Sequence, residues 1–189
     1  RFFREEFNQD NKILWLPDVF GYSGALPQIM KKCGYDSYIC CRPNPEMMDL
    51  PRDFWWVGKD GSRVKVTRTT DENLYCTAFG NAKNEIIRMA SSYADGEVGV
   101  ALWGVGNHGG GATRKDLSEL AVFMEEQKTE GIEVFHSTPE AFFAASAPKA
   151  EWDAALQPCF VKCYTSIARL KHRYAELENK LLMTEKICS

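Results

Sequence analysis

Asp18 is the first residue whose position suggests chemistry, because it follows a short hydrophobic run that ends at a proline. Residues 12–16, KILWL, predict a buried strand, and Pro17 ends it since proline cannot donate a ladder hydrogen bond. Residues 25–32 then predict a helix. An acid in the loop between a strand and a helix is where α/β barrels present catalytic groups. An aspartate that only caps a helix or closes a turn produces the same local pattern, so Asp18 needs further support.

Histidine and cysteine are the other residue types here that could bind a metal ion. His108 lies in the glycine loop GNHGGG after a predicted strand, which is a reasonable place for a zinc ligand. Cys159 and Cys163 are four residues apart and would form half a metal site on a helix face. The seven cysteines match neither a paired disulfide framework nor a CxxC zinc site. We therefore expect reduced thiols and a cytoplasmic protein.

The composition of the chain excludes several classes of function. Its 189 residues carry a net charge of -3, and 23 basic and 26 acidic residues are interspersed, so no basic face for nucleic acid is expected. No apolar run approaches about 18 residues, and the N-terminus lacks the apolar core of a secretion signal. We expect no membrane partner, and the sequence leaves the oligomeric state open.

Strands and helices are predicted to alternate along most of the chain, which is typical of parallel βαβ units and favours an α/β fold. Asp60 and Gly61 form the strongest hairpin signal. The expected helices span residues 82–93, 113–131 and 138–146, and the expected strands span residues 37–41, 53–57, 63–68, 99–106 and 132–137.

The character of the sequence changes from Pro148 onward, where a long amphipathic helix is predicted and no further strand. We expect residues 1–150 to be part of a catalytic barrel and residues 151–189 to begin a helical domain. The chain starts on an apparent helix without a cap and stops within an amphipathic pattern. We interpret it as a fragment of a longer protein.

Four stretches, taken in order, resemble the α-mannosidases of glycoside hydrolase family 38. They are LWLPDVFGYSGALPQIMKKCG, FWWVGKDGSRVKV, GVGNHGGGATRKDL and CYTSIARLKHRYAELENKLLMTEK. The resemblance implies a (β/α)7 barrel followed by a three-helix bundle, of which this chain would contain the later barrel part and the first bundle helix. It also implies zinc-dependent, retaining hydrolysis of an α-mannoside or a mannose-containing oligosaccharide.

The resemblance assigns roles to several residues. Asp18 corresponds to the family's nucleophile, which also binds zinc. A retaining glycosidase needs such a carboxylate to form a glycosyl-enzyme and a second one to protonate the leaving group. Phe20 matches the aromatic residue that lines the sugar subsite, with packing in the core as the alternative. Arg42 stands where the family can place an arginine that faces the substrate.

The sequence does not single out one residue as the acid/base, and it lacks the motifs that hold the family's other zinc ligands. The loop TRTTDENLYC offers Asp71 and Glu72 as the acid/base, and we choose Asp71. The resemblance makes His108 a wall of the sugar pocket, because the family's other zinc ligands lie in H-x-D and F-H-D motifs that this chain lacks. With Asp18 as its one family ligand, the chain should not hold Zn2+ alone and should be inactive by itself.

Two other functions fit the same residues. A non-catalytic relative could bind carbohydrate, and the aromatic run Phe54-Trp55-Trp56 would suit stacking on sugars. Another metal-dependent carbohydrate hydrolase, such as a deacetylase-like enzyme, could use Asp18 to orient water instead of attacking carbon. An H-x-D motif upstream and an F-H-D motif downstream in the longer protein would favour the mannosidase.

Overall fold

The computed structural model describes residues 2–44, 47–69, 75–94, 96–106, 110–129, 131–157 and 160–188. The chain divides into two compact units, residues 1–159 and residues 160–189, which are described separately below. In the described part of the chain, no helix is both long enough and apolar enough to cross a bilayer.

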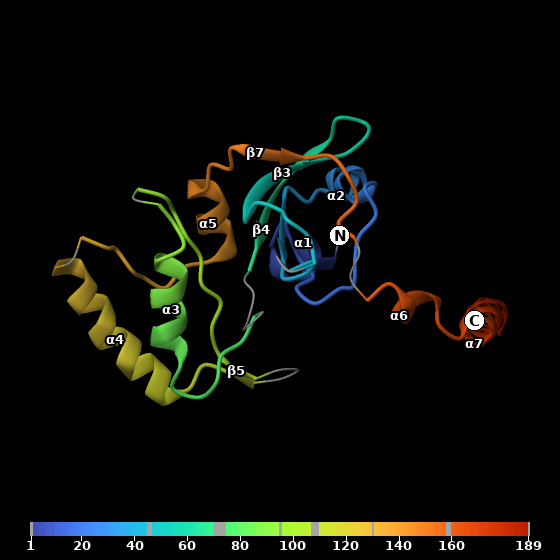
Figure 1. Cartoon of the computed structure of the whole chain (residues 1–189). Coiled ribbons are helices and arrows are strands. Elements are labelled where there is room, and N and C mark those ends of the chain that lie inside the picture. The colour runs from blue at the N-terminus through green and yellow to red at the C-terminus, as the bar shows by residue number, and fades with distance from the viewer. Residues whose placement is uncertain are drawn as a thin grey trace. The chain divides into compact units, whose positions relative to one another are not determined.

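A five-stranded mixed sheet forms the centre of the first unit (Figure 1). Its order is β1-β2-β4-β3-β7, and the strands are β1 Ile13–Trp15, β2 Ser37–Cys40, β4 Arg63–Arg68, β3 Asp53–Val57 and β7 Ala150–Trp152. Strands β1, β2 and β4 are parallel, β3 runs antiparallel to β4, and β7 runs parallel to β3. The carboxyl ends of β1, β2 and β4 therefore meet at one edge of the sheet.

Helix α2, Leu26–Cys33, connects β1 to β2 and packs on one face of the sheet. Its Met30 joins the main core cluster with Tyr38, Val64 and Trp56, which are all fully or almost fully buried. Successive residues of a strand point to opposite faces, and the other face carries Ile13 and Ile39 and packs on α5, Pro139–Ala145. The sheet thus has two covered faces.

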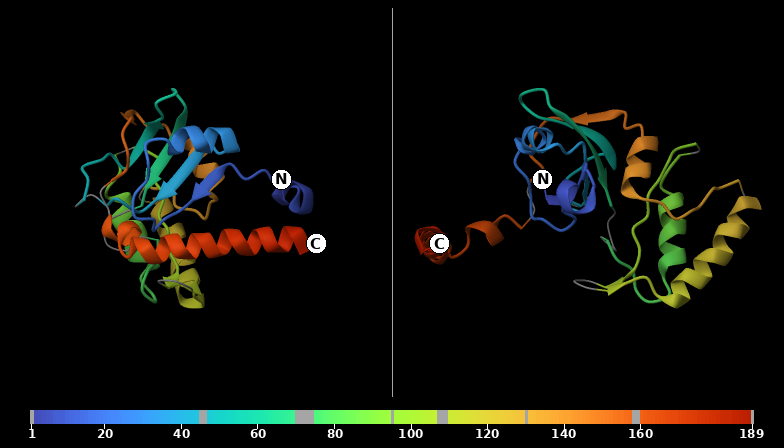
Figure 2. Two further views of the ribbon diagram at one scale, coloured as in Figure 1. Left: turned by 90° about the vertical axis from the view of Figure 1, so that its right-hand side faces the viewer. Right: turned by 180° about the vertical axis from the view of Figure 1, so that it is seen from behind.

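Helices α3, Ala82–Ala90, and α4, Arg114–Thr129, pack side by side, as both views of Figure 2 allow the reader to follow. Leu120 and Phe123 of α4 are buried in a cluster with Ala82. Thr113 caps the start of α4, since the Asp116 backbone N–H donates to its hydroxyl, and that hydroxyl donates to the Asp116 carboxylate. Short strands β5, Val105–Gly106, and β6, Gly110–Gly111, make a separate ribbon.

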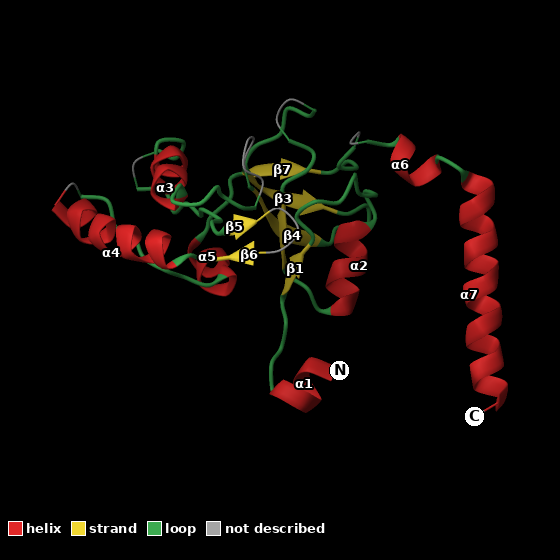
Figure 3. Ribbon diagram, turned by 90° about the horizontal axis from the view of Figure 1, so that it is seen from below, coloured by secondary structure: helices red, strands yellow, loops and turns green. Residues whose placement is uncertain are grey.

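Helix α1, Phe2–Phe7, precedes the sheet. The second unit contains the short helix α6, Lys162–Thr165, and helix α7, Ala168–Cys188. Figure 3 shows α7 as a long straight helix that follows α6 after a loop. The apolar side chains of α7 are exposed, among them Leu170, Tyr174 and Leu177.

The structure confirms the predicted hairpin, because Asp53–Val57 pairs with Arg63–Arg68 around Asp60 and Gly61. Other expectations for strands were wrong. Residues 132–137 form no strand, and of residues 99–106 only Val105–Gly106 does so. The expectation of no strand after Pro148 was also wrong, since β7 pairs with β3. A strand requires a neighbour to pair with, and the amino-acid pattern of one segment does not specify that neighbour.

Candidate active site

Asp18 and Arg42 meet at the edge formed by the carboxyl ends of the parallel strands. Asp18 lies three residues after β1, and Arg42 lies two residues after β2. The Arg42 Nε–H donates to Oδ1 of Asp18, and their side chains are only 16% and 28% exposed. An ion pair that is mostly shielded from water holds the carboxylate in one orientation more firmly than a surface pair would.

Phe20 completes this arrangement. The Arg42 guanidinium carbon lies 5.7 Å from the centroid of the Phe20 ring, within the range of a cation–π contact. One arginine therefore connects the acid and the aromatic residue that the sequence placed in the same loop. The three side chains Asp18, Phe20 and Arg42 form the candidate active site.

Tyr22 anchors the loop that carries Asp18. Its side chain is buried, and its hydroxyl donates to the carbonyl oxygen of Leu16 at 2.7 Å. Its backbone N–H and carbonyl form both hydrogen bonds of a bridge to Leu156. Gly21 just before it has φ of +109°, a conformation that side-chain-bearing residues rarely adopt. The loop after β1 is thus fixed on both sides of Asp18.

Backbone hydrogen bonds align the other strand ends with this loop. The Cys41 N–H donates to the Pro17 carbonyl at 2.8 Å, and the Thr69 N–H donates to the Cys40 carbonyl at 2.8 Å. The Cys41 sulfur and the Thr69 hydroxyl oxygen lie 2.9 Å apart. Polar side chains from three consecutive parallel strand ends are therefore brought to one place.

The negative charge of Asp18 affects the pKa of two residues that the sequence did not suggest, Cys41 and Tyr75. Burial raises the pKa of Cys41 to about 11; the hydrogen bond with Thr69 lowers it, and the negative charge of Asp18 adds to the increase. Burial, and then the negative charge of Asp18, also raise the pKa of Tyr75. Both groups are therefore neutral near pH 7. Tyr75 lies in the predicted acid/base loop, so its place after β4 was a signal that could have found it.

A small cavity of 210 Å³ lies next to Tyr75. Cys76 and Trp103 line it together with the glycines of the β5–β6 ribbon. Gly104 has φ of +137° and Gly110 has φ of +150°, and an added Cβ at Gly110 would meet the Val105 carbonyl oxygen at 1.7 Å. Only glycine lets the two strands of the ribbon approach each other in this way.

The structure brings Asp18, Phe20 and Arg42 together, and the roles that the resemblance gives them stay predictions. Asp71, Glu72 and His108 lie outside the described residues, so their roles stay predictions. The idea that Phe54 and Trp56 stack on sugars was wrong. They are 1% and 0% exposed in strand β3, because alternate residues of that strand face the core.

The described residues do not by themselves fit a zinc ion. No group of three or more His, Cys, Asp or Glu side chains among them could hold a metal. Asp18 offers one carboxylate, and Arg42 already binds that carboxylate. Zinc sites in proteins use at least three protein ligands, so the other ligands would have to come from outside the described residues.

A mixed α/β fold with a carboxylate held at the carboxyl ends of parallel strands is the arrangement of many glycoside-cleaving enzymes. The family model for the Glycosyl hydrolases family 38 N-terminal domain matches residues 1–161. The chain therefore belongs to glycosyl hydrolase family 38.

Individual relatives agree with this assignment. The chain is 30% identical to Alpha-mannosidase 2C1 of Homo sapiens over 100% of its own length and 19% of that protein. It is 33% identical to an Alpha-mannosidase of Saccharomyces cerevisiae over 64% of the chain and 11% of that protein. The chain thus spans about a fifth or less of these curated relatives.

The fold is also similar to that of a solved structure, an alpha-mannosidase from Enterococcus faecalis V583. The TM-score is 0.59 with 16% sequence identity, and the match covers 81% of this chain and 19% of that one. At this identity the similarity concerns the fold alone.

Proposed function

We propose that the protein containing this chain is a retaining α-mannosidase in which Asp18 is the nucleophile. The observation that carries the proposal is the position of Asp18, at the carboxyl end of β1 and bound by Arg42. Membership of family 38 and the names of the relatives supply the substrate class, an α-mannoside or a mannose-containing oligosaccharide.

Retaining hydrolysis needs two steps. An oxygen of the Asp18 carboxylate attacks the anomeric carbon, the bond from that carbon to the leaving oxygen breaks, and an acid protonates the leaving oxygen. A water molecule then attacks the same carbon, gives its proton to the acid's conjugate base and releases Asp18. We assign the acid/base to Asp71, on the loop after β4.

The Arg42 Nε–H donates to Oδ1 of Asp18 and not to Oδ2. We assign the attacking role to Oδ2, because an oxygen that donates electrons to carbon cannot remain fully engaged with a cation. Arg42 then orients the carboxylate and stabilises its charge each time it departs from the sugar. Phe20 limits water around the pair and forms part of the sugar subsite.

Zinc remains a proposal for the longer protein. When bound, it would act as a Lewis acid next to the substrate and the carboxylate. Because the described residues supply too few ligands, no step above depends on it. We likewise propose that the sheet is part of a (β/α)7 barrel and that the second unit, residues 160–189, begins a helical bundle. All six described cysteines are free thiols, which supports the proposed cytoplasmic location.

The proposal is tested by Asp18→Asn in the full-length protein, with an activated α-mannoside as substrate. Asn keeps the shape and a capping oxygen of Asp but cannot form the glycosyl ester. We expect turnover to fall at least about a thousandfold, which is about 4 kcal/mol in the barrier, with little change in Tm. Asp10→Asn is the matched control, since Asp10 is exposed and pairs with Arg4 and Lys12. Turnover of Asp18→Asn within tenfold of the parent would refute the nucleophile assignment.

A wild-type protein that binds mannosides but never cleaves them would instead support a carbohydrate-binding relative. Release of acetate from an acetylated sugar, without cleavage of the glycosidic bond, would support the deacetylase-like alternative.

A further inference from the structure

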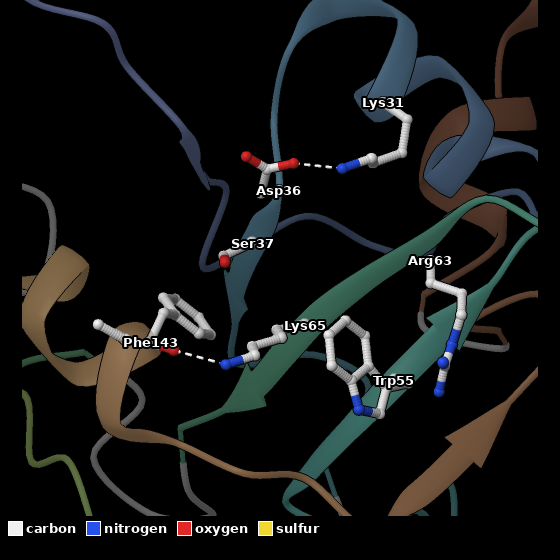
Figure 4. A pocket seen from close by; sticks show the side chains of 8 residues that line it. Lys31, Asp36, Ser37, Trp55, Arg63, Lys65 and Phe143 are labelled. Carbon is white, nitrogen blue, oxygen red and sulfur yellow. Dashed lines mark hydrogen bonds and ion pairs between the residues drawn. The ribbon is translucent and has the colours of Figure 1, made fainter.

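A second cavity lies at the opposite end of the parallel strands from Asp18. It has a volume of 310 Å³, and Figure 4 shows the side chains around it. Ser37 at the start of β2, Lys65 of β4 and Trp55 of β3 are direct neighbours in the sheet register. Side chains at paired positions point to the same face, so these three form a continuous row along the cavity.

The cavity is rich in positive charge. Lys31, Arg63 and Lys65 line it, together with one acid, Asp36. Lys31 pairs with Asp36, and Arg63 pairs with Glu151, which comes from strand β7. Three cations thus stand against two carboxylates, and Lys65 has no carboxylate partner among the described residues.

Lys65 is held in place by carbonyl groups. Its ammonium group donates to the carbonyl oxygen of Phe143 at 2.7 Å and to that of Ser146 at 2.8 Å, at the end of helix α5. An ammonium group has three donors, so one N–H remains. The carbonyl groups orient the Lys65 ammonium group but do not neutralise its charge. A negatively charged ligand would neutralise it.

The Trp55 ring contacts the cationic side chains of Arg63 and Lys65, so it is not free to stack on a sugar. The guanidinium carbon of Arg63 lies 4.7 Å from the Trp55 ring centroid and the Lys65 nitrogen lies 5.7 Å from it. Figure 4 shows the ring between these two side chains. The aromatic face that a neutral sugar would use is therefore engaged with cations.

Donors exceed acceptors in this cavity. Ser37 is 6% exposed, and within the described part of the chain its hydroxyl has no hydrogen-bond partner. The described bond of Arg63 to Glu151 uses only Nη2, which leaves further N–H groups of the guanidinium. A ligand with several acceptor oxygens and negative charge would satisfy these donors best.

We propose that the cavity binds a small oxyanion of the phosphate class, either free phosphate or the phosphate group of a phosphorylated sugar. The Ser37 hydroxyl, the remaining Lys65 N–H and the Arg63 guanidinium donate to its oxygens, and Lys31 adds charge. The cavity borders the start of β2, whereas Asp18 and Arg42 lie beyond the ends of β1 and β2. The site is separate from the candidate active site and does not depend on the proposed function.

The test is isothermal titration calorimetry on the full-length protein at low ionic strength, with three probes. These are inorganic phosphate, a hexose 6-phosphate and the same hexose without phosphate. We expect saturable binding of a phosphate-bearing probe with Kd below about 1 mM, and no binding of the plain hexose. Tighter binding of inorganic phosphate would identify free phosphate as the ligand, tighter binding of the hexose phosphate would identify a phosphorylated sugar, and equal affinity would support a site that recognises the phosphate group alone.

Arg63→Gln and Ser37→Ala should each weaken binding, the former by at least about tenfold, since bonds from a charged donor are the strong ones. Lys59→Gln is the matched control, because Lys59 is exposed on the same hairpin, pairs with Asp153 and does not line the cavity. Tm measured for each variant separates loss of the site from loss of the fold. The proposal is overturned by absence of saturable binding to the wild type, by equal weakening in Lys59→Gln, or by equal affinity for the plain hexose.

Discussion

Arg42 donates a hydrogen bond from Nε to the carboxylate of Asp18, although 24 residues separate them in the chain. The contact connects the loop after β1 with the loop after β2 at the carboxyl edge of the sheet. Because the same guanidinium lies against Phe20, one side chain fixes both the acid and the aromatic residue of the candidate active site. Arg42 is therefore the residue on which the orientation of Asp18 depends most directly.

Arg42→Gln in the full-length protein should lower kcat/KM for an α-mannoside by about 10-fold to 100-fold. The substitution leaves a largely shielded carboxylate without its cation and free to rotate, and misplacement of about 1 Å can cost this much. Arg42→Lys should recover part of the loss, since it keeps the charge but not the Nε donor.

The matched control for Arg42 is Arg52→Gln. Arg52 also combines a hydrogen bond, to the Ser92 hydroxyl, with a ring contact, to Tyr93 at 4.6 Å, and no contact of Arg52 with Asp18 is described. If steady-state kinetics show the same loss in both variants, Arg42 has no specific role in orienting Asp18.

Tyr22→Phe should destabilise the protein by about 1 kcal/mol, because it removes the partly buried hydrogen bond to the Leu16 carbonyl and keeps the ring packed. Urea unfolding of the two proteins measures the difference. Tyr35→Phe is the control, since no hydrogen bond of the Tyr35 hydroxyl occurs among the described residues, and we expect a change below about 0.5 kcal/mol. Equal effects would show that the Tyr22 hydroxyl does not anchor the loop.

Cys41 should resist alkylation near neutral pH. Burial and the charge of Asp18 raise its pKa from 9.0 to about 11, so almost none of it is thiolate at pH 8. Iodoacetamide followed by peptide mass spectrometry should label exposed Cys33 and Cys163 first and Cys41 only after unfolding. Because the folded state favours the neutral thiol, the stability contributed by this group is present below pH 9 and is lost as the pH rises toward 11. Rapid labelling of native Cys41 at pH 8 would contradict the position described for it.

Asp116→Asn should destabilise the contact of α3 with α4 by about 1 to 3 kcal/mol, since Asn cannot accept from both partners as the carboxylate does. The Thr113 hydroxyl and the Ala82 N–H hold the pKa of Asp116 below its ordinary value of 3.8. The carboxylate therefore stabilises the fold above pH 3.8, and this contribution is lost as the pH falls through the lower folded value. Urea unfolding should show the difference between wild type and variant shrinking from pH 5 toward pH 3. The exposed Asp49→Asn is the control, and a pH-independent difference for Asp116→Asn would refute the explanation.

Local signals predict the elements around the candidate site well. Strand β1 ends two residues before Pro17, Gly34 ends α2 in the left-handed conformation, and Asp60-Gly61 turns the hairpin, each near a residue type with a strong backbone preference. The meeting of Asp18 and Arg42 follows from parallel strands, whose carboxyl ends share an edge. The sequence supports that inference through the alternation of strands and helices.

Features that depend on distant partners were not predicted. Trp152 and its neighbours form β7 only because β3 offers them a free edge, and Tyr22 anchors its loop through Leu156, which lies far along the chain. The raised pKa of Tyr75 likewise depends on its position near Asp18. Composition and periodicity describe one segment at a time, so contacts of this kind require the folded structure.

The most direct test of the account is identification of the residue that carries the sugar during turnover. The full-length protein is incubated with a 2-fluoro α-mannosyl substrate, whose glycosyl-enzyme forms faster than it hydrolyses, and peptides are mapped by mass spectrometry. We predict a single fluoromannosyl adduct on the peptide containing Asp18, absent from Asp18→Asn and present in Asp10→Asn. An adduct on another carboxylate, or turnover of this substrate with no covalent adduct at all, would contradict the assignment of Asp18 as the nucleophile.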